Sequence, residues 1–378
     1  MRTLAIAAAL VFAGPAFAQD VPYSVAPKLF DMLRPNDLGL KPAPAVQTFT
    51  VFRAGDKGNT YANGVALIVF KGRLYVQWQA SQKDEDSSDT HVLYAVSDDG
   101  EHWSSPKLLA DVGKTIRTSG GWLSDGKNLV AYINVWKSDF RNGGTTIARA
   151  STDGLSWGKR VPVTGQDGKP VPGVIEQDTR ALPDGRLVTA FHLQPGLKAT
   201  PFYTDDPLGL SGWRAGRMAH LSHEGLESRE LEPSWFRRAD GCLVMVFRDQ
   251  ADSFRQIASQ SCDRAETWSL PSLTDMPDSR AKQSAGNLTD GTAFLVNAPS
   301  GSKLRAPLVL TLSSDGRLFK SAYILRAGPP PAVRFLGLYK RPGFHYPKSV
   351  IWKDALYVGY AAGKEDVEIT RVPLAGLH

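Results

Sequence analysis

Cysteine is scarce in this chain of 378 residues, and no metal-binding motif is present. The only cysteines, Cys242 and Cys262, lie too far apart for a CxxC motif, and no HExxH segment or Cys/His cluster suggests zinc. No glycine-rich loop that would cradle a nucleotide phosphate occurs either. The sequence therefore predicts no cofactor and leaves open only a structural calcium ion.

Long apolar runs are also absent, apart from one short run at the amino terminus. Residues 1–18 have the pattern of a secretory signal, with a basic Arg2, an apolar stretch at residues 4–12 and a cleavage site at Ala16-Phe17-Ala18. The apolar stretch is too short to span a bilayer, which takes about 20 residues. We therefore expect an exported protein, periplasmic or secreted, that does not bind a membrane.

Charge of one sign is not concentrated anywhere in the chain. The formal net charge is +6, and the lysines and arginines are scattered without a basic run, so no nucleic-acid partner is expected. The mild basic excess fits ordinary solubility and also the attraction of an anionic substrate. The protein is expected to act as a monomer.

The chain does contain one short motif four times. The copies are SDDGEHW at residues 97–103, STDGLSW at 151–157, SCDRAETW at 261–268 and SSDGRLF at 313–319. They recur about every 50 to 60 residues, with a degenerate copy near residues 203–213 in the one longer interval. Each is a Ser-x-Asp turn in which the carboxylate accepts backbone N–H groups, so the motif is structural rather than catalytic. Strands and turns with this period are typical of a β-propeller.

Six hairpins accompany these motifs and predict an all-β fold with six propeller blades. Their turns lie at Gly72, Gly126, Gly185, Gly241, Gly291 and Asp354. The last blade has only three clear strands, so residues 49–53 are expected to supply the fourth and close the ring. We predict an amino-terminal arm at residues 19–48 on the surface and a propeller at 49–378. Seven blades are the alternative if residues 20–48 hold further strands.

The two cysteines are predicted to form a disulfide. A hairpin folded symmetrically about Asp252 places Cys242 directly opposite Cys262. Cross-strand Cβ atoms lie about 4.5–5.5 Å apart, within reach of a disulfide. An exported protein meets an oxidising environment, which favours the bond over two free thiols.

Polar residues open the first strand of each blade. These strands line the channel of a propeller, so their first residues converge on one mouth: Asn63, Arg117, Asp178, Glu232, Lys282 and Tyr346. Loops between second and third strands reach the same mouth and add Asp86, Asp89, His91, Arg248 and Arg305, among others. Buried polar groups are costly unless they are paired or used, so this mouth is the candidate functional site.

The repeated Asp boxes, together with Glu232-Pro233-Ser234, Arg248, Arg305 and Tyr346, resemble the sialidase (neuraminidase) superfamily across the whole mature chain. The resemblance implies an enzyme that exo-cleaves a glycosidic bond at a sialic or uronic acid. Tyr346 would be the nucleophile and Glu232 would take its proton, since a phenol with a pKa near 10 needs a neighbouring base. A tyrosine nucleophile is a recognised exception to the two-carboxylate rule of glycosidases.

The same resemblance assigns the remaining site residues. Asp86, or alternatively Asp89, matches the general acid, and Arg248 and Arg305 match two of three arginines that bind the substrate carboxylate bidentately. Further substrate-binding candidates at the mouth are Asn63, His91, Asp178 and His345.

The chain departs from the resemblance at the start of the first blade. Sialidases carry an arginine there, whereas this chain reads Thr60-Tyr61-Ala62-Asn63-Gly64. Residues 71–78, 85–86, 92–99, 305–308 and 346–368 resemble more closely the sialidase-like propellers that act on rhamnose linked to glucuronate, by hydrolysis or by β-elimination. Their histidines after the equivalent of Tyr61 are also missing, and His91, His192 or His345 are the candidates to stand in. Hydrolysis, β-elimination and binding of an acidic glycan without cleavage therefore remain open.

Overall fold

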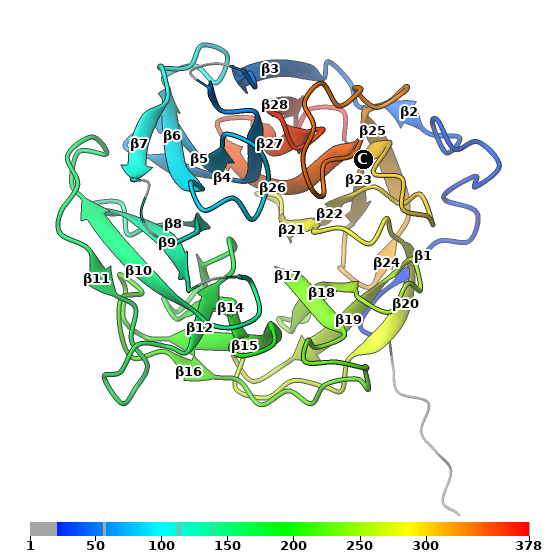
Figure 1. Ribbon diagram of the computed structural model, residues 1–378. Helices are drawn as coiled ribbons and strands as arrows, with labels where there is room; N and C mark the ends of the chain where they lie inside the picture. The colour runs from blue at the N-terminus through cyan, green and yellow to red at the C-terminus, as the bar shows by residue number, and fades with distance from the viewer. Residues whose placement is uncertain (1–20, 56–57, 112, 114, 138, 378) are drawn as a thin grey trace, which may run out of the picture.

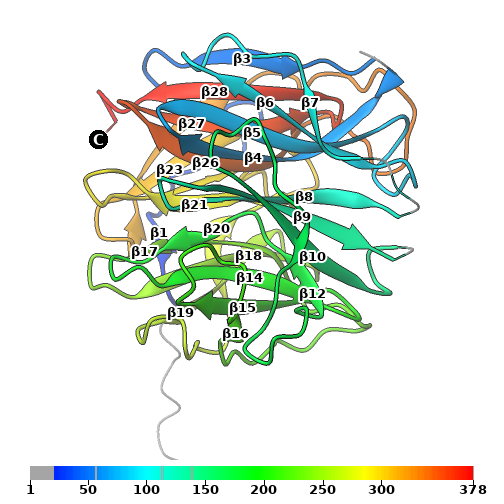
Figure 2. The same cartoon turned by 90° about the vertical axis from the view of Figure 1, so that its left-hand side faces the viewer.

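The computed structural model describes residues 21–55, 58–111, 113, 115–137 and 139–377, so the predicted signal segment lies outside the described residues. The described chain consists of strands and turns arranged as six antiparallel blades around a central axis (Figure 1). Seen from the side, the strands run across the thickness of the ring (Figure 2). The predicted all-β fold with six blades is confirmed. No helix able to cross a membrane occurs among the described residues.

The blades follow one another along the chain. Blade 1 has β4 (Tyr61–Phe70), β5 (Arg73–Ser81), β6 (His91–Ser97) and β7 (Lys107–Ala110), and blade 2 has β8 (Arg117–Ser124), β9 (Leu129–Trp136), β10 (Gly144–Ser151) and β11 (Val161–Pro162). Blade 3 has β12 (Gly173–Ile175), β13 (Arg180–Ala181), β14 (Leu187–Leu193), β15 (Lys198–Thr204) and β16 (Arg214–Ala215). Blade 4 has β17 (Glu230–Arg237), β18 (Leu243–Asp249), β19 (Arg255–Ser261) and β20 (Ser272–Pro277). Blade 5 has β21 (Ser284–Asn287), β22 (Ala293–Asn297), β23 (Leu308–Ser313) and β25 (Ser321–Arg326).

Blade 6 joins the two ends of the chain. It contains β26 (Phe344–Trp352), β27 (Ala355–Ala362), β28 (Asp366–Pro373) and, as its outer strand, β3 (Gln47–Phe52). β3 pairs antiparallel with β28, with Phe49 opposite Ile369. The strand expected at residues 49–53 therefore closes the ring, and the seven-bladed alternative does not occur.

Residues 21–46 run along the outside of blades 4 and 5. Two short strands in this segment, β1 (Ser24–Val25) and β2 (Lys41–Pro42), pair in parallel with β24 (Leu318–Phe319) and β25. Tyr23 is fully buried there, and its hydroxyl donates a hydrogen bond to Gln256 Oε1 at 2.6 Å. The predicted surface arm thus also contributes to the core.

The first strand of blade 3 is interrupted. β12 and β13 are separated by residues 176–179, of which Glu176 and Gln177 line the channel cavity. The Gln177 amide donates there to the carbonyl of Gly64 at 2.7 Å and to Ser119 Oγ at 3.1 Å. These hydrogen bonds to blades 1 and 2 replace the strand pairing that the blade loses.

The Asp boxes form the turns that their sequence predicts. In the first copy, Asp99 Oδ1 accepts the backbone N–H groups of Glu101 at 2.9 Å and His102 at 2.8 Å, and Ser97 Oγ accepts that of Gly100. Gly100 has a φ of +86°, and a Cβ there would lie 2.6 Å from the Tyr357 ring of blade 6. The glycine is needed both for the turn and for the close approach of the next blade.

The apolar core is divided among the blade interfaces. Six clusters of buried side chains each join two neighbouring blades, such as Val76 and Trp78 of blade 1 with Tyr357 of blade 6. The aromatic residue of the second Asp box, Trp157, stacks on Trp122 with ring centroids 5.9 Å apart. Each blade is thus buried against both neighbours.

The predicted disulfide between Cys242 and Cys262 is present, with the Cα atoms 4.3 Å apart. Leu243 pairs with Ser261 across the β18–β19 hairpin, which is the register that symmetry about Asp252 requires.

Candidate active site

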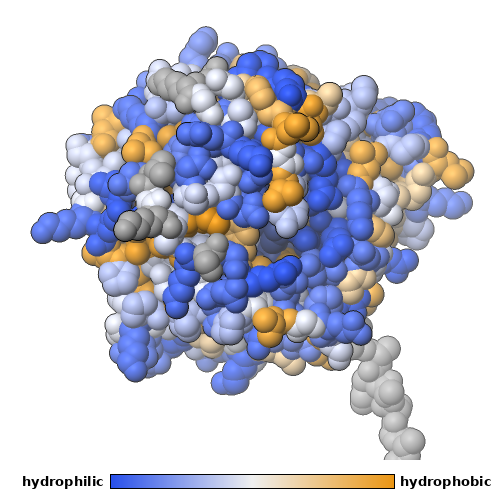
Figure 3. All heavy atoms as spheres, in the orientation of Figure 1, coloured by the Kyte–Doolittle hydropathy of each residue, from blue (hydrophilic) through white to orange (hydrophobic). Residues whose placement is uncertain are grey.

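A cavity of about 640 Å³ opens at one mouth of the central channel. All six blades contribute to its walls, and hydrophilic residues surround the hollow in the middle of the ring (Figure 3). Five of the predicted site residues line it: Asp86, Glu232, Arg248, Arg305 and Tyr346. Residues far apart in the sequence are therefore brought to one place.

Tyr346 lies at the inner end of β26 among several cations. Its ring lies 5.2 Å from the Arg305 guanidinium, 5.4 Å from Lys364 Nζ and 5.6 Å from Lys282 Nζ. Burial raises the pKa of the Tyr346 phenol, and the carboxylates of Glu232 and Glu85 raise it further. Tyr346 is thus a neutral phenol that needs a proton acceptor before it can act as a nucleophile.

The backbone at the site is set by bulges in the first strands of four blades. Pairing shifts register in β4, β8, β17 and β26, and one residue in each bulge has a positive φ. This residue is Gly64 in blade 1 and Gly121 in blade 2, but Glu232 in blade 4 (φ +53°) and Tyr346 in blade 6 (φ +56°). A non-glycine residue held in this region costs about 1–3 kcal/mol, and such strain gathers at functional sites.

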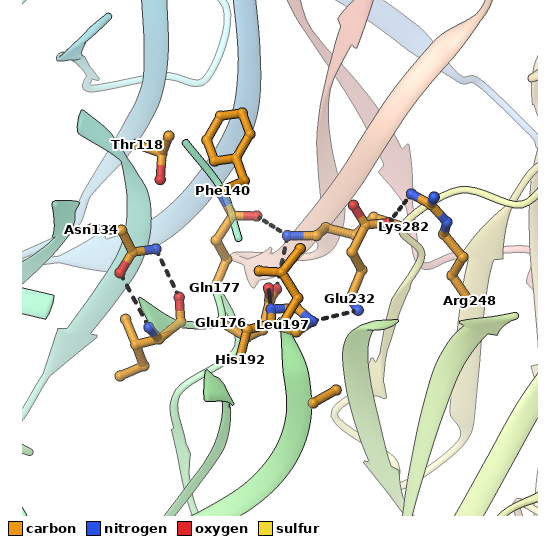
Figure 4. Close-up of polar contacts among 12 residues, drawn as sticks. Thr118, Asn134, Phe140, Glu176, Gln177, His192, Leu197, Glu232, Arg248 and Lys282 are labelled. Carbon is orange, nitrogen blue, oxygen red and sulfur yellow. Dashed lines mark hydrogen bonds and ion pairs between the residues drawn. The ribbon is translucent and has the colours of Figure 1, made fainter. Parts of the chain in front are cut away.

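Glu232 is an ionised carboxylate held by blades 3 and 4 (Figure 4). Its Oε2 accepts a hydrogen bond from Arg248 Nη1 at 2.9 Å, and its backbone N–H donates to His192 Nε2 at 3.1 Å. Burial would raise the pKa of Glu232, but the charges of Arg248 and Lys282 bring it down to about 2. No hydrogen bond between Glu232 and Tyr346 is formed among the described residues, and the hydrogen bond from Arg248 uses only the Oε2 atom of the Glu232 carboxylate.

A buried ionic network that sequence reasoning missed lies beside Glu232. Glu176 accepts hydrogen bonds from Lys282 Nζ at 2.8 Å and from His192 Nδ1 at 2.9 Å (Figure 4). Burial opposes its ionisation, but Lys282 and His192 lower its pKa. The only sequence signal was that Glu176 immediately precedes Gln177 in the channel-facing segment of blade 3.

Asp86 lies on the rim of the cavity, on the loop between β5 and β6. Partial burial raises its pKa, as does its hydrogen bond to the neighbouring Asp84 carboxylate. A raised pKa favours the protonated carboxyl that a general acid requires. The alternative, Asp89, does not line the cavity, and its Oδ2 accepts the backbone N–H of Gln82 at 2.9 Å.

Arg305, which lines the cavity, forms a buried pair with His345, which does not. Arg305 Nη1 donates to His345 Nδ1 at 2.7 Å, and His345 Nε2–H donates to the carbonyl of Arg341 at 2.9 Å. Burial, with Arg305 and Lys364 nearby, lowers the pKa of His345 well below its usual value. His345 is therefore a neutral acceptor for Arg305, and it does not itself line the cavity.

Arg341 is a cavity residue that the sequence analysis did not select. It lies in the segment between β25 and β26, five residues before Tyr346, where no strand pattern marked it. Burial lowers the pKa of its guanidinium, and the positive charge of Arg305 lowers it further. The two arginines are therefore close enough to repel each other.

Besides His345, three further predicted substrate-binding residues do not line the cavity in the part of the chain that is described. Asn63 is buried and donates a hydrogen bond to Glu85 Oε1 at 3.4 Å. His91 Nδ1 is hydrogen-bonded to the carbonyl of Asp89 at 2.9 Å. Asp178 forms an ion pair with Lys348. Their polar groups take part in the internal hydrogen bonding of the channel.

The opposite side of the cavity has an apolar wall. Trp136 and Phe140 meet edge to face with ring centroids 4.9 Å apart, and Val174 and Leu197 pack beside them. The cavity thus joins a cationic side around Tyr346 to an apolar side between blades 2 and 3, a combination typical of small-ligand sites.

Residues 72–358 match the BNR repeat-like domain. The chain belongs to this family. No curated protein sequence matches the chain.

Solved sialidase structures share the fold of this BNR propeller. One sialidase has a TM-score of 0.68 at 18% identity over 93% of this chain, which spans only 35% of that protein. The Hadza microbial sialidase Hz136 has a TM-score of 0.71 at 13% identity, covering 88% of this chain and 69% of its own. A protein of unknown function from Dyadobacter fermentans is matched over its whole length, with 87% of this chain, a TM-score of 0.67 and 14% identity. Identities this low establish the fold alone.

The first blade of this BNR propeller has no arginine at the cavity. Gly64 lines the wall there, and a Cβ at this position would lie 2.8 Å from Gln79 Oε1. No group of three or more His, Cys, Asp or Glu side chains that could hold a metal ion is found in the described part of the chain.

Proposed function

We propose that this BNR propeller is an exported glycosidase that exo-cleaves a glycosidic bond at an acidic sugar. The observation that carries the proposal is the neutral phenol of Tyr346, held in a strained bulge beside the ionised Glu232 and the cationic Arg305. A protein that only bound glycans would have no need for a half-buried tyrosine beside an ionised carboxylate. The fold shared with sialidases and the disulfide, which suits export, support the proposal.

In the proposed reaction, Tyr346 and Asp86 act on the two sides of the glycosidic bond. Glu232 takes the phenolic proton while the Tyr346 oxygen bonds to the anomeric carbon, and the bond to the leaving oxygen breaks as Asp86 protonates it. Water, deprotonated by Asp86, then displaces the tyrosine, and the proton held by Glu232 returns to the phenol. The cations around Tyr346 stabilise the negative charge that develops on its oxygen.

The same cations make β-elimination the second candidate. A uronate loses its C5 proton more readily when positive groups neutralise its carboxylate. The ionised Glu232 at the cavity would accept this proton, and the bond from C4 to the leaving oxygen would break as a C4–C5 double bond forms. Three cations lie within 6 Å of the Tyr346 ring, so the cavity could supply this neutralisation. In that reaction Tyr346 would protonate the leaving oxygen.

Incubation with sialosides and with rhamnosyl-glucuronate oligosaccharides tests these functions. Hydrolysis is expected to release a saturated sugar acid or a free terminal sugar, whereas elimination would release an unsaturated uronate, seen by its ultraviolet absorbance. Tyr346→Phe is expected to lower kcat by about a hundredfold or more, because the phenyl ring cannot attack.

Tyr339→Phe is the matched control, because Tyr339 also lines the cavity but is 57% exposed. We expect it to retain near-normal turnover. Equal turnover by Tyr346→Phe and the wild type would exclude Tyr346 as the nucleophile, and binding of either oligosaccharide without any cleavage would indicate a glycan-binding propeller.

A further inference from the structure

Most cations at the cavity already have a carboxylate partner. Four of them are paired in this way: Lys282 with Glu176 at 2.8 Å, Arg248 with Glu232 at 2.9 Å, Arg141 with Glu227 at 2.6 Å, and Lys364 with Glu85. Their charges are largely neutralised before any ligand arrives. Arg248, in particular, uses Nη1 for Glu232 and Nη2 for Gln250.

Arg305 and Arg341 are the exceptions among the described cavity residues, since neither guanidinium has a carboxylate partner. Arg305 is 4% exposed, bonds only the neutral His345 and the carbonyl of Arg280, and has a buried Nε without a partner. A buried cation without a counter-ion is costly, and its retention here calls for an anion that the protein itself does not supply.

The backbones that carry the two guanidiniums are held side by side, because Arg305 forms a bridge with Gly343, two residues after Arg341. His345 accepts from the Arg305 side chain through one ring nitrogen and donates to the Arg341 backbone through the other. The segment that carries Arg341 is anchored on blades 6 and 1, because Glu365 accepts the N–H of Phe335 at 2.7 Å and Asp84 accepts that of Leu338 at 3.2 Å. The repulsion between the arginines is therefore maintained by the fold and would be relieved by a bound anion.

We propose that Arg305 and Arg341, positioned by His345, form the site that binds the carboxylate of the sugar, while Arg248 is reserved for Glu232. Arg341 would thereby take the place of the arginine that the first blade lacks, from a loop of the last blade. The identity of the ligand as a sugar acid rests on the proposed function. Two adjacent guanidinium forks fit a planar carboxylate, which either a uronic acid or a 2-ulosonic acid supplies.

Binding of free sugar acids tests this site without requiring turnover. D-glucuronate and N-acetylneuraminate are titrated into the purified protein by calorimetry, with D-glucose as the uncharged counterpart, and the tighter acid identifies the source of the carboxylate. Arg341→Gln is expected to weaken binding of that acid by about 10- to 100-fold, because it removes a charge-assisted contact. Arg341→Lys keeps the charge but loses the fork, so an intermediate loss is expected.

Arg141→Gln is the charge-matched control. It removes the same charge from the cavity wall, but Arg141 is paired with Glu227 and its side chain is 66% exposed, so the affinity is expected to change by less than about threefold. The assignment would be overturned if Arg141→Gln and Arg341→Gln lost equal affinity for the sugar acid. It would also be overturned if the wild type bound both acids no more tightly than it binds glucose. Cleavage of an acidic glycan with unchanged acid affinity in Arg341→Gln would overturn the arginine pair while leaving the proposed function intact.

Discussion

At Glu232 and Tyr346, burial acts on two neighbouring acids with opposite outcomes, because nearby cations outweigh burial at Glu232 whereas burial dominates at Tyr346. Burial disfavours the charged form of both groups. Glu232 is hydrogen-bonded to Arg248 and keeps its charge, with a pKa of about 2, whereas Tyr346 faces two carboxylates and its pKa is raised. The site thus holds a base that is charged and a phenol that is neutral at the same pH.

Asp86 leads to a prediction about the pH dependence of turnover. As a general acid it must carry its proton, so kcat/KM is expected to fall as the pH rises through its raised pKa. Asp84→Asn removes the carboxylate that accepts the Asp86 proton. The pKa of Asp86 should then be lower, so kcat/KM should begin to fall at a lower pH. The measurement is the pH profile of kcat/KM on the cleaved glycan.

Asp89→Asn is the control for that profile, since Asp89 does not line the cavity. In Asp89→Asn, kcat/KM should fall over the same pH range as in the wild type. Loss of turnover in Asp89→Asn, together with an unchanged pH profile in Asp84→Asn, would transfer the role of the general acid from Asp86 to Asp89.

At the scale of the strand, the bulges in β17 and β26 direct the side chains of Glu232 and Tyr346 into the channel. Both residues have a positive φ there, which strains the backbone. Blades 1 and 2 relieve the same strain with Gly64 and Gly121. Blades 4 and 6 keep Glu232 and Tyr346 at these positions, which is expected where a side chain is needed for function.

The strain at Glu232 can be measured as a difference between two variants. Glu232→Ala and Glu232→Gly both remove the carboxylate from Arg248, but only the glycine relaxes the positive φ. We expect Glu232→Gly to have a free energy of unfolding about 1 kcal/mol higher than Glu232→Ala, from denaturant titrations. At Arg237, on the same strand with no positive φ, the order should be reversed. If the alanine variant is the more stable one at Glu232 as well as at Arg237, the backbone at Glu232 is not strained.

At the scale of the whole molecule, stability depends on closing the ring. The core is shared among six blade interfaces, so an open ring would leave two faces without a partner. β3 prevents this: Phe52 packs into the cluster between blades 6 and 1, and Thr48 hydrogen-bonds Thr370 side chain to side chain at 2.9 Å.

Two truncations test the role of β3. A chain that begins at residue 46 keeps β3 and is expected to unfold cooperatively, although at a lower temperature because Tyr23 is lost from the core. A chain that begins at residue 54 lacks β3 and should show no cooperative transition in calorimetry. Melting of the shorter chain at the temperature of the longer one would show that the ring does not need this strand.

Local features of this protein could be predicted from its sequence. The Asp-box turns and the hairpin register depend on residues within a few positions of each other, so the repeat, the six blades and the disulfide follow from spacing alone. The channel-facing ends of the blades also follow from strand order, which is why Tyr346, Glu232, Arg248, Arg305 and Asp86 were found together.

Only the tertiary structure decided how these groups are paired. Arg341 lies in a segment without strand periodicity and carried no sequence signal for its place at the cavity, and Glu176, at the break between β12 and β13, was indicated only by its position next to Gln177. That Glu232 is bonded to Arg248, while Arg305 has no counter-ion, depends on distances between blades that are far apart in the chain. The sequence by itself determined the ring and five of the residues at its mouth, because those follow from local hydrogen bonding and periodicity. The charge of the site was decided by contacts between blades, because electrostatic energies depend on distance and burial, which no local pattern encodes.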